Sequence, residues 1–281
     1  MGAVGNSQLE RRSMTGNCYE EFAAVAAAIA RQAGAVLMAG FGRVERVEFK
    51  GRINLVTEFD RRSEAAIVEA LRGRYPDHLI VAEEGGGREA GRRSSPYRWL
   101  IDPLDGTTNY AHGNPYFNVS IALQEGGETI VGVVYDPVQD ELFQAVRGGG
   151  AQLNGTPLHV SATADLVHAL LTTGFPYRSE HRPAALARWA AFMDAAQQVL
   201  CQGAAALDLC GVAAGRFDGY YEAQLEPWDC GAGALIVTEA GGRVTDYRGG
   251  PFDPFKGEAV ASNGPLHDAM LAVLATVEPA T

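Results

Sequence analysis

The stretch Trp99–Asn109, with the sequence WLIDPLDGTTN, places two carboxylates after a short apolar run, on either side of a Pro-Leu pair. We expect the apolar residues to form a buried strand, and the proline to fix the backbone so that Asp102 and Asp105 project to one side. The Gly-Thr-Thr that follows would open a helix whose free N–H groups can hold an anion. The same segment is also consistent with a strand that ends in a turn, after which Asp105 caps a helix.

Acidic residues also mark two other segments. Glu83 and Glu84 follow the apolar run 79–82, and Asp229 precedes a run of small residues at 231–234. Since adjacent side chains on a strand point to opposite faces, we assign Glu83 to the site and Glu84 to its surroundings. Four gathered carboxylates cannot all stay ionised without a cation, and hard divalent ions prefer oxygen ligands. The sequence predicts metal-dependent phosphate chemistry; the alternatives are an exposed acidic turn and a helix capped by Asp229.

The composition and the net charge restrict the classes of protein to which this chain can belong. With 281 residues, 47% of them hydrophobic and 20% charged, the chain can bury one large core or two adjoining ones. The formal net charge of -11 argues against nucleic acid as the main partner. The four cysteines form no C-x-x-C pair, the six histidines are scattered, and no apolar stretch approaches the roughly 18 residues of a membrane span. We expect a cytoplasmic protein without structural zinc and without a membrane segment.

Hydrophobic periodicity and turn residues divide the chain into alternating helices and strands. Helices are expected at 19–39, 58–74, 183–199, 204–214, 229–240 and 265–276, with a hairpin in 44–56. Strands are expected at 79–82, 99–101, 117–123, 129–135, 142–146, 169–172, 219–222, 243–245 and 259–261. The pattern predicts a mixed α+β or α/β fold. Its parts are a flexible tail at 1–17, an N-terminal α+β half at 18–155 with most of the metal ligands, and a C-terminal α/β half at 156–281.

Taken together, these segments closely resemble the inositol monophosphatase family of metal-dependent, lithium-sensitive phosphatases. The resemblance runs from about Tyr19 to Leu274 and rests on two signature segments, Trp99–Tyr110 and Glu226–Gly242, which are highly specific as a pair. The segments 50–60, 173–177 and 219–222 add to it. The resemblance implies a layered αβαβα sandwich of the sugar-phosphatase type, usually assembled as a homodimer, that uses Mg²⁺ to hydrolyse a small phosphate monoester.

The resemblance also implies roles for individual residues. The implied Mg²⁺ ligands are Glu83, Asp102, Asp105, Asp229 and the carbonyl of Leu104. Asp60 and Thr107, together with Glu83, match catalytic positions that orient and polarise the attacking water. Gly106 and Thr107 would hold the phosphate through backbone donors. The substrate positions are Asp105, Gly106, Thr107, Gly203, Ala204, Ala205, Glu222 and Asp229, and Lys50 matches a lysine near a third metal position.

The substrate is argued from Thr108 and Asn109, which resemble the inositol branch of the family rather than its nucleotide or histidinol-phosphate branches. Leu200 and Ala204 depart from the family pattern, which often has Arg and Ser or Thr at these positions. We expect hydrolysis of myo-inositol 1-phosphate by an activated water, since no G-x-S-x-G segment offers a covalent nucleophile. Two alternatives stay open: a broader sugar phosphatase that includes fructose 1,6-bisphosphate, and an interaction or regulatory protein on a phosphatase scaffold.

Overall fold

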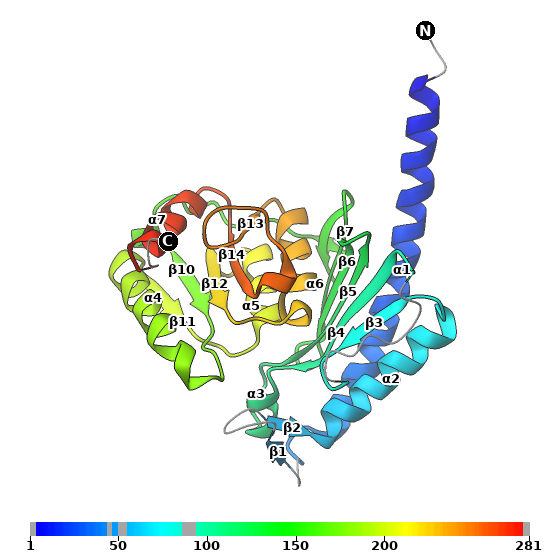
Figure 1. The fold of residues 1–281 in the computed structure, drawn as a ribbon, viewed down its shortest axis with the longest axis horizontal. Coiled ribbons are helices and arrows are strands. Elements are labelled where there is room, and N and C mark those ends of the chain that lie inside the picture. The colour runs from blue at the N-terminus through cyan, green and yellow to red at the C-terminus, as the bar shows by residue number, and fades with distance from the viewer. Residues whose placement is uncertain (1–3, 44–46, 50–54, 86–93, 278–281) are drawn as a thin grey trace.

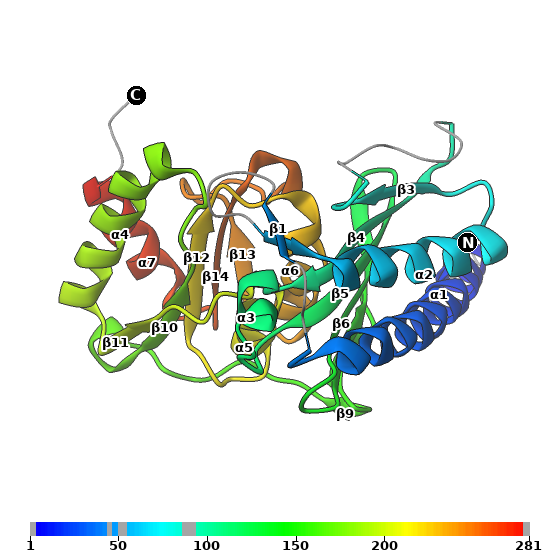
Figure 2. The same ribbon diagram turned by 90° about the horizontal axis from the view of Figure 1, so that it is seen from below.

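The computed structural model describes residues 4–43, 47–49, 55–85 and 94–277. In this part of the chain, helices and two β-sheets alternate in layers (Figure 1). Helices α1 (Val4–Gly40) and α2 (Glu58–Arg74) form one outer layer, and α4 (Arg182–Ala195) and α7 (His267–Val277) form the other. Helices α5 (Ala205–Ala213) and α6 (Pro227–Glu239) lie between the two sheets (Figure 2). The αβαβα sandwich implied by the resemblance is confirmed.

The first sheet has seven strands that follow one another in sequence order. They are β3 (Leu79–Ala82), β4 (Tyr97–Asp105), β5 (Asn118–Glu125), β6 (Glu128–Asp136), β7 (Glu141–Val146), β8 (Gly150–Leu153) and β9 (Thr156–Pro157). β3 and β4 pair parallel, and the other neighbours pair antiparallel. The short strands β8 and β9 were not expected, because they show little hydrophobic alternation. They extend this sheet to Pro157, beyond the expected boundary at 155.

The second sheet has five strands in the order β11-β10-β12-β14-β13. They are β10 (Leu170–Thr173), β11 (Gln198–Leu200), β12 (Gly219–Ala223), β13 (Arg243–Thr245) and β14 (Glu258–Ser262). β10 runs parallel to both of its neighbours, whereas β14 pairs antiparallel with β12 and β13. Parallel and antiparallel pairs therefore coexist in this half.

The expected helix at 183–199 is wrong at its C-terminal end. α4 stops at Ala195, and Gln198–Leu200 form the edge strand β11, in register with residues 170–172 of β10. Val199 is buried in that position. Pairing with β10 and burial of a β-branched side chain outweigh the helical tendency of the segment.

Helix α1 begins at Val4 rather than at the expected residue 19, and its first turns extend away from the sheets (Figure 1). The flexibility expected of residues 1–17 stays a prediction. Cys18–Gly40 is long and apolar enough to cross a membrane, with a mean hydropathy of 1.6, which corrects the statement that no stretch approaches a span. However, 50% of its most apolar window is buried, and residues of this segment belong to the core of the first sheet. In this structure it is a core helix.

Close packing of α6 brings its first turn to the junction of the two halves. A Cβ at Gly132 of β6 would lie 2.6 Å from the Ala232 carbonyl oxygen, and one at Gly233 would lie 2.6 Å from the Cβ of Leu209 in α5. Gly132 of β6 and Gly233 of α6 therefore allow α6 to contact both the sheet and α5 closely. The hairpin of β1 (Val47–Phe49) and β2 (Leu55–Thr57) and the short helix α3 (Thr107–Ala111) lie together at one end of the molecule (Figure 1).

Candidate active site

The two aspartates of the Trp99–Asn109 stretch both lie on β4, which continues through them. Asp102 pairs with Ser120 of β5, but Asp105 pairs with Asn118, so β4 has one more residue than β5 in this interval. Side chains three positions apart on a regular strand point to opposite faces, and the extra residue of a β-bulge corrects this. The shared orientation expected of the two carboxylates therefore depends on a bulge, not on a turn that ends the strand.

Asp102 is buried, with 3% of its surface exposed. Its Oδ1 accepts a hydrogen bond from the Leu104 N–H at 3.0 Å. Burial raises the pKa of Asp102 well above its ordinary value. Neighbouring negative charges raise that pKa further, namely those of Glu83, Asp105 and Asp229. Because these residues follow β3, end β4 and open α6, the structure brings together carboxylates from distant parts of the chain.

Asp105 joins the two halves of the molecule. Asn118 Nδ2 donates to its Oδ2 at 2.7 Å, and the N–H groups of Ala205 and Ala206 at the start of α5 donate at 3.2 and 2.8 Å. Burial raises the pKa of Asp105 to about 6, while these donors act against the rise because they stabilise the carboxylate. The sequence analysis missed Asn118, whose role follows only from its strand pairing with Asp105.

Asp229 is the third residue of α6, not its cap. Glu226 caps the helix, and the Glu226 N–H donates to Asp229 Oδ2 at 2.8 Å in a capping box. Burial raises the pKa of Asp229 well above its ordinary value, and the charges of Asp105 and Glu83 contribute. The interpretation of Asp229 as the capping residue is therefore wrong, because Glu226 occupies that position.

The four carboxylates fit a divalent cation by charge and by chemistry. All supply oxygen ligands of the kind that Mg²⁺ prefers, and a bound cation would offset both their burial and their mutual repulsion. Within the described ranges, no group of three or more acidic, histidine or cysteine side chains is already arranged around a single point. Lys50, expected near a third metal, lies outside the described residues.

Asp60, Thr107 and Leu104 form a buried hydrogen-bonded group beside the carboxylates. Thr107 Oγ1 lies 3.0 Å from Asp60 Oδ1 and 3.0 Å from the Leu104 carbonyl oxygen. Asp60 Oδ2 accepts from the N–H and the hydroxyl of Thr57, at 2.8 and 2.6 Å, in the capping box of α2. Burial is the main cause that raises the pKa of Asp60, and the charge of Glu83 adds to it. With one hydroxyl proton, Thr107 can donate to only one of its two acceptors at a time.

Gly106 occupies a position where a larger residue would be strained. Its φ of 89° lies in the left-handed region, and a Cβ there would lie 2.8 Å from the Tyr116 carbonyl oxygen. The turn at Gly106 allows α3 to begin at Thr107, two residues after Asp105. The backbone expected to hold the phosphate therefore adjoins the carboxylates.

Apart from Asp229 on α6, the expected substrate residues of the second half lie at the start of α5, in the loop before it and on β12. Asn109 fixes this loop, because its Nδ2 donates to the Gln202 carbonyl at 2.8 Å. Ala204 is buried, and the Ala205 N–H already donates to Asp105. Leu200 ends β11 and is half-buried. The structure thus brings this loop to Asp105, but leaves little side-chain surface of Ala204 for a ligand.

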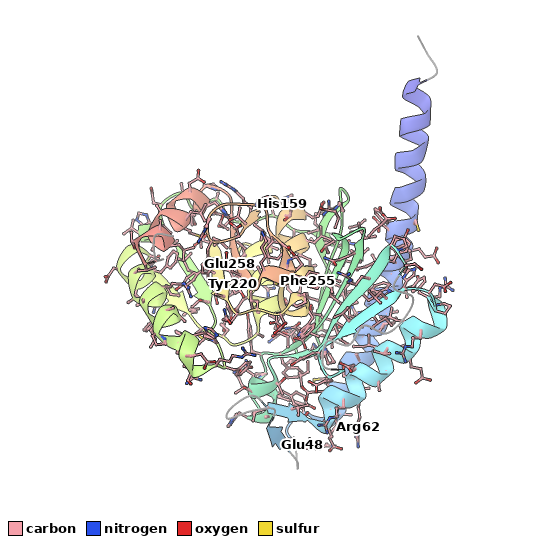
Figure 3. All side chains as sticks on the ribbon, in the orientation of Figure 1. Glu48, Arg62, His159, Tyr220, Phe255 and Glu258 are labelled. Atoms are coloured by element: carbon pink, nitrogen blue, oxygen red, sulfur yellow. The ribbon has the colours of Figure 1, made fainter. Side chains whose placement is uncertain are left out.

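Glu222 approaches the same region from the second sheet. The hydroxyl of Tyr220, which lies in the interior of the second half (Figure 3), donates to Glu222 Oε2 at 2.9 Å. Burial raises the pKa of Glu222 to about 7, and the charge of Asp105 also raises it. A Cβ at Gly174 would collide with the Glu222 carboxylate, so this carboxylate lies directly on the backbone that follows β10. The two carboxylates of Glu222 and Asp105 are within electrostatic reach of each other.

Known proteins resemble this chain over most of its length. The family model of the inositol monophosphatases matches residues 19–278. The chain belongs to the inositol monophosphatase family. A relative from Pasteurella multocida named "Nus factor SuhB" is 46% identical over 241 residues, which are 85% of this chain and 90% of the relative. An inositol-1-monophosphatase from Synechocystis sp. is 45% identical over 245 residues, which are 86% of this chain and 85% of the relative.

Solved structures of inositol monophosphatases and SuhB proteins share the fold. The inositol monophosphatase from Anabaena (Nostoc) sp. has a TM-score of 0.83 and 42% identity, covering 92% of this chain and 97% of that one. The extragenic suppressor protein SuhB from Bartonella henselae has a TM-score of 0.85 and 38% identity, covering 89% of this chain and 96% of that one. Membership of the inositol monophosphatase family supports a phosphatase that acts on a small phosphate compound.

Proposed function

We propose that this chain is a Mg²⁺-dependent phosphomonoesterase that hydrolyses myo-inositol 1-phosphate to inositol and phosphate. The observation that carries the proposal is the pair of Asp60 and Thr107, hydrogen-bonded at 3.0 Å on the side of the molecule where neighbouring carboxylates raise the pKa of Asp102. A hydroxyl–carboxylate pair can orient a water and take up its proton, and a carboxylate cluster can hold a cation. Both are needed for phosphate ester hydrolysis without a covalent nucleophile.

Each group in the site has a proposed role. When bound, Mg²⁺ would neutralise charge on the phosphate and favour ionisation of a water. Its proposed ligands are Glu83, Asp102, Asp105, Asp229 and the Leu104 carbonyl. The Thr107 hydroxyl oxygen accepts a hydrogen bond from the attacking water while its own proton points to Asp60, and Glu83 completes the catalytic set. The N–H groups of Gly106 and Thr107 hold the phosphate.

The ring of the substrate would contact carboxylates and backbone groups from both halves. The proposed contacts are Asp105, Gly203, Ala204, Ala205, Glu222 and Asp229. Carboxylates are good acceptors for ring hydroxyls, and Thr108 offers no positive charge to a second phosphate of a nucleotide. The name of the Synechocystis relative supports inositol 1-phosphate. A broader sugar phosphatase that includes fructose 1,6-bisphosphate would use the same roles and is the alternative within enzymes.

A regulatory protein built on the phosphatase scaffold is a second candidate. It is supported by the relative from Pasteurella multocida, 46% identical, whose name is Nus factor SuhB. Affinity capture with an Asp102→Asn variant tests this role apart from catalysis. If the variant retains one defined partner that the unmodified chain also binds, a second role is supported; if neither retains a partner, the catalytic function stands alone.

We further infer a homodimer in the cytoplasm. Helix α4 exposes Leu186 and Met193, with 51% and 38% of their surfaces accessible, which a second subunit can cover. All four cysteines are unpaired, and Cys210 and Cys230 are buried as thiols, as expected in a reducing compartment. Multi-angle light scattering of the full chain tests the dimer, because a monomer mass at micromolar concentration would contradict it.

Phosphate release from a panel of substrates tests the proposed reaction. The panel contains inositol 1-phosphate, fructose 1,6-bisphosphate, 3′-phosphoadenosine 5′-phosphate and an aryl phosphate, with Mg²⁺ or a chelator. We expect the highest kcat/KM for inositol 1-phosphate and no turnover in the chelator. Glu222→Gln should reduce the preference for inositol 1-phosphate and spare the aryl phosphate. Turnover without metal would contradict the mechanism, and a preference for fructose 1,6-bisphosphate would support the broader phosphatase.

A further inference from the structure

Asp208 is a buried carboxylate that the proposed reaction does not use. It is the fourth residue of α5, and only 1% of its surface is exposed. Its neighbours in sequence, Leu207 and Leu209, are buried and apolar, and burial raises the pKa of Asp208 well above its ordinary value. An apolar side chain of similar size would fill this position without the free-energy cost of burying a carboxyl group. Packing alone therefore does not account for Asp208.

Two hydroxyl groups from distant parts of the chain donate to the Asp208 carboxylate. The Tyr116 hydroxyl, from the segment between α3 and β5, lies 2.8 Å from Oδ1. The Thr172 hydroxyl, from β10, lies 2.9 Å from Oδ2. Through these two bonds Asp208 links α5 to the segment that precedes β5 in the first sheet and to a strand of the second sheet.

Tyr116 is also connected to the loop before α5 through its backbone. Its carbonyl oxygen accepts a hydrogen bond from Asn109 Nδ2 at 2.9 Å, and the same amide donates to the Gln202 carbonyl at 2.8 Å. This carbonyl oxygen is the atom that a Cβ at Gly106 would approach to 2.8 Å. Tyr116 is thus joined to the loop by its carbonyl, through Asn109, and to α5 by its hydroxyl, through Asp208.

The segment from Gln202 to Asp208 is enclosed by these two links. Within it, the N–H groups of Ala205 and Ala206 donate to Asp105 at 3.2 and 2.8 Å. The same segment carries the backbone that we propose to contact the ring of the substrate. A shift of the segment would change its position relative to Asp105, and displacements of about 1 Å can cost about a hundredfold in rate.

We propose that Tyr116 and Asp208 are positioning residues, whose hydrogen bond fixes the start of α5 relative to Asp105 and to the ring of the substrate. The inference rests on the proposed phosphatase function and adds two residues that belong neither to its metal ligands nor to its substrate contacts. A directional hydrogen bond inside the protein specifies one arrangement of the backbone, whereas apolar contacts of similar volume specify it less strictly. The pair therefore contributes to catalysis through geometry, and its net contribution to stability is small.

A double variant separates geometry from stability. Tyr116→Phe/Asp208→Leu makes both partners apolar, which can be neutral or stabilising, so its Tm should equal or exceed that of the unmodified chain. We expect kcat/KM for inositol 1-phosphate at saturating Mg²⁺ to fall by about tenfold to a hundredfold. Amide hydrogen exchange within 202–206, followed by mass spectrometry, should become faster, because the segment loses one of its two links.

A conservative substitution tests whether the hydrogen bonds, rather than the negative charge, are responsible. In Asp208→Asn the amide oxygen can accept from Tyr116, and the amide NH₂ can donate to the Thr172 hydroxyl. That hydroxyl can then donate to the Leu200 carbonyl, which lies 3.4 Å away. We expect Asp208→Asn to keep kcat/KM within about threefold of the unmodified chain. A loss equal to that of the double variant would overturn the proposal.

Tyr135→Phe is the matched control. It removes another tyrosine hydroxyl that donates to an aspartate, Asp140, at 2.9 Å, and Tyr135 packs in the core that α1 forms with the first sheet. This variant should change neither kcat/KM nor hydrogen exchange within 202–206. An equal fall in kcat/KM in Tyr135→Phe and in the double variant would show a general effect of losing such a hydroxyl, and would overturn the positioning role.

The remaining outcomes also decide the proposal. Full activity of the double variant would overturn it. If the double variant does not fold, Tyr116→Phe alone should lower kcat/KM by about threefold to tenfold, and unchanged kinetics in this variant would overturn the proposal. If the unmodified chain hydrolyses no phosphate ester, the proposed function fails, and hydrogen exchange decides the positioning role. Faster exchange within 202–206 in Tyr116→Phe than in Tyr135→Phe would then support that role, and equal exchange would overturn it.

Discussion

The hydroxyl oxygen of Thr107 lies 3.0 Å from the Asp60 carboxylate, although 47 residues separate them in sequence. Helix α2 places Asp60 there, because its other carboxylate oxygen accepts the Thr57 N–H at 2.8 Å in the capping box. One carboxylate thus stabilises the start of a helix and contacts the site. Substitution of Asp60 would disturb both, so Thr107 offers the cleaner test of the pair.

Thr107→Ala should lower kcat by about a hundredfold with little change in KM, because it removes a hydroxyl that orients water and spares the backbone donors. Thr107→Ser retains the hydroxyl and should keep most of the activity. Steady-state kinetics with inositol 1-phosphate measures both variants. An increase in KM alone would make Thr107 a substrate-binding residue instead.

Asp102→Asn should have opposite effects on activity and on stability. It removes a metal ligand charge, so we expect turnover to fall by about a hundredfold or more. It also removes a buried charge that lies among other carboxylates, so the Tm in chelator should rise. Asp268→Asn, at an exposed residue, is the control for both measurements. Near-normal turnover in excess Mg²⁺ would contradict the assignment of Asp102 as a ligand.

The raised pKa of Glu222 predicts how the stability of the metal-free protein depends on pH. Burial raises its pKa to about 7 in the folded protein, whereas an unfolded chain has an ordinary value of about 4.3. The folded state then binds the proton more tightly, so its stability is greatest below the ordinary pKa and is lost as pH rises toward 7. Glu222 should contribute a decrease in unfolding free energy on the order of 1–3 kcal/mol between about pH 4 and pH 7. Urea unfolding of Glu222→Gln should show a smaller decrease, and an identical pH dependence would assign it to other groups.

Local sequence signals predicted the elements around the site well. Helix α2 runs from Glu58 to Arg74 as expected, because acidic residues in its first turn and the Tyr75-Pro76 pair mark its ends locally. Strand β11 was missed, because Gln198–Leu200 become a strand only through pairing with β10. Non-local pairing of this kind leaves little trace in a short segment.

The features of the site likewise fall into those that local sequence signals reveal and those that depend on distant parts of the chain. Asp102 and Asp105 stand out in the sequence because they follow an apolar run, but the bulge that orients them depends on the register between β4 and β5. Asn118, which holds Asp105 at 2.7 Å, has no distinguishing pattern of its own. The residue types at the site could be predicted from the sequence, whereas their strand-pairing and hydrogen-bond partners, which lie far away in the sequence, could not.

Lithium should inhibit turnover more than sodium at matched ionic strength. Li⁺ is a small, hard cation that can occupy an oxygen site vacated by Mg²⁺, but it supplies half the charge. The position shared by Asp102, Asp105 and Asp229 would be the most open to this exchange. Leu200 and Ala204 supply none of these carboxylates, so they should not abolish the effect. A titration of LiCl against NaCl at saturating substrate and fixed Mg²⁺ measures it, and equal responses would indicate a lithium-resistant member of the family.

Gly106 and Gly113 form a matched pair for testing the close approach of the backbone at the site. Both have positive φ, 89° and 73°, but a Cβ at Gly113 would meet nothing within 4 Å, whereas one at Gly106 would lie 2.8 Å from the Tyr116 carbonyl oxygen. Gly113→Ala should therefore lower the free energy of unfolding only by the cost of placing an alanine at positive φ, about 1–2 kcal/mol. This variant should retain activity.

Gly106→Ala adds a collision with backbone that cannot rotate away, so we expect it to destabilise by about 2–5 kcal/mol. It should also lower kcat, because relief of the collision would move Thr107 relative to Asp60 and Asp105. Urea unfolding and steady-state kinetics of the two alanine variants provide the comparison. If both variants lose the same stability and keep full activity, the turn between β4 and α3 is not what holds Thr107 in place, and its position must depend on the hydrogen bonds to Asp60 and Leu104 alone.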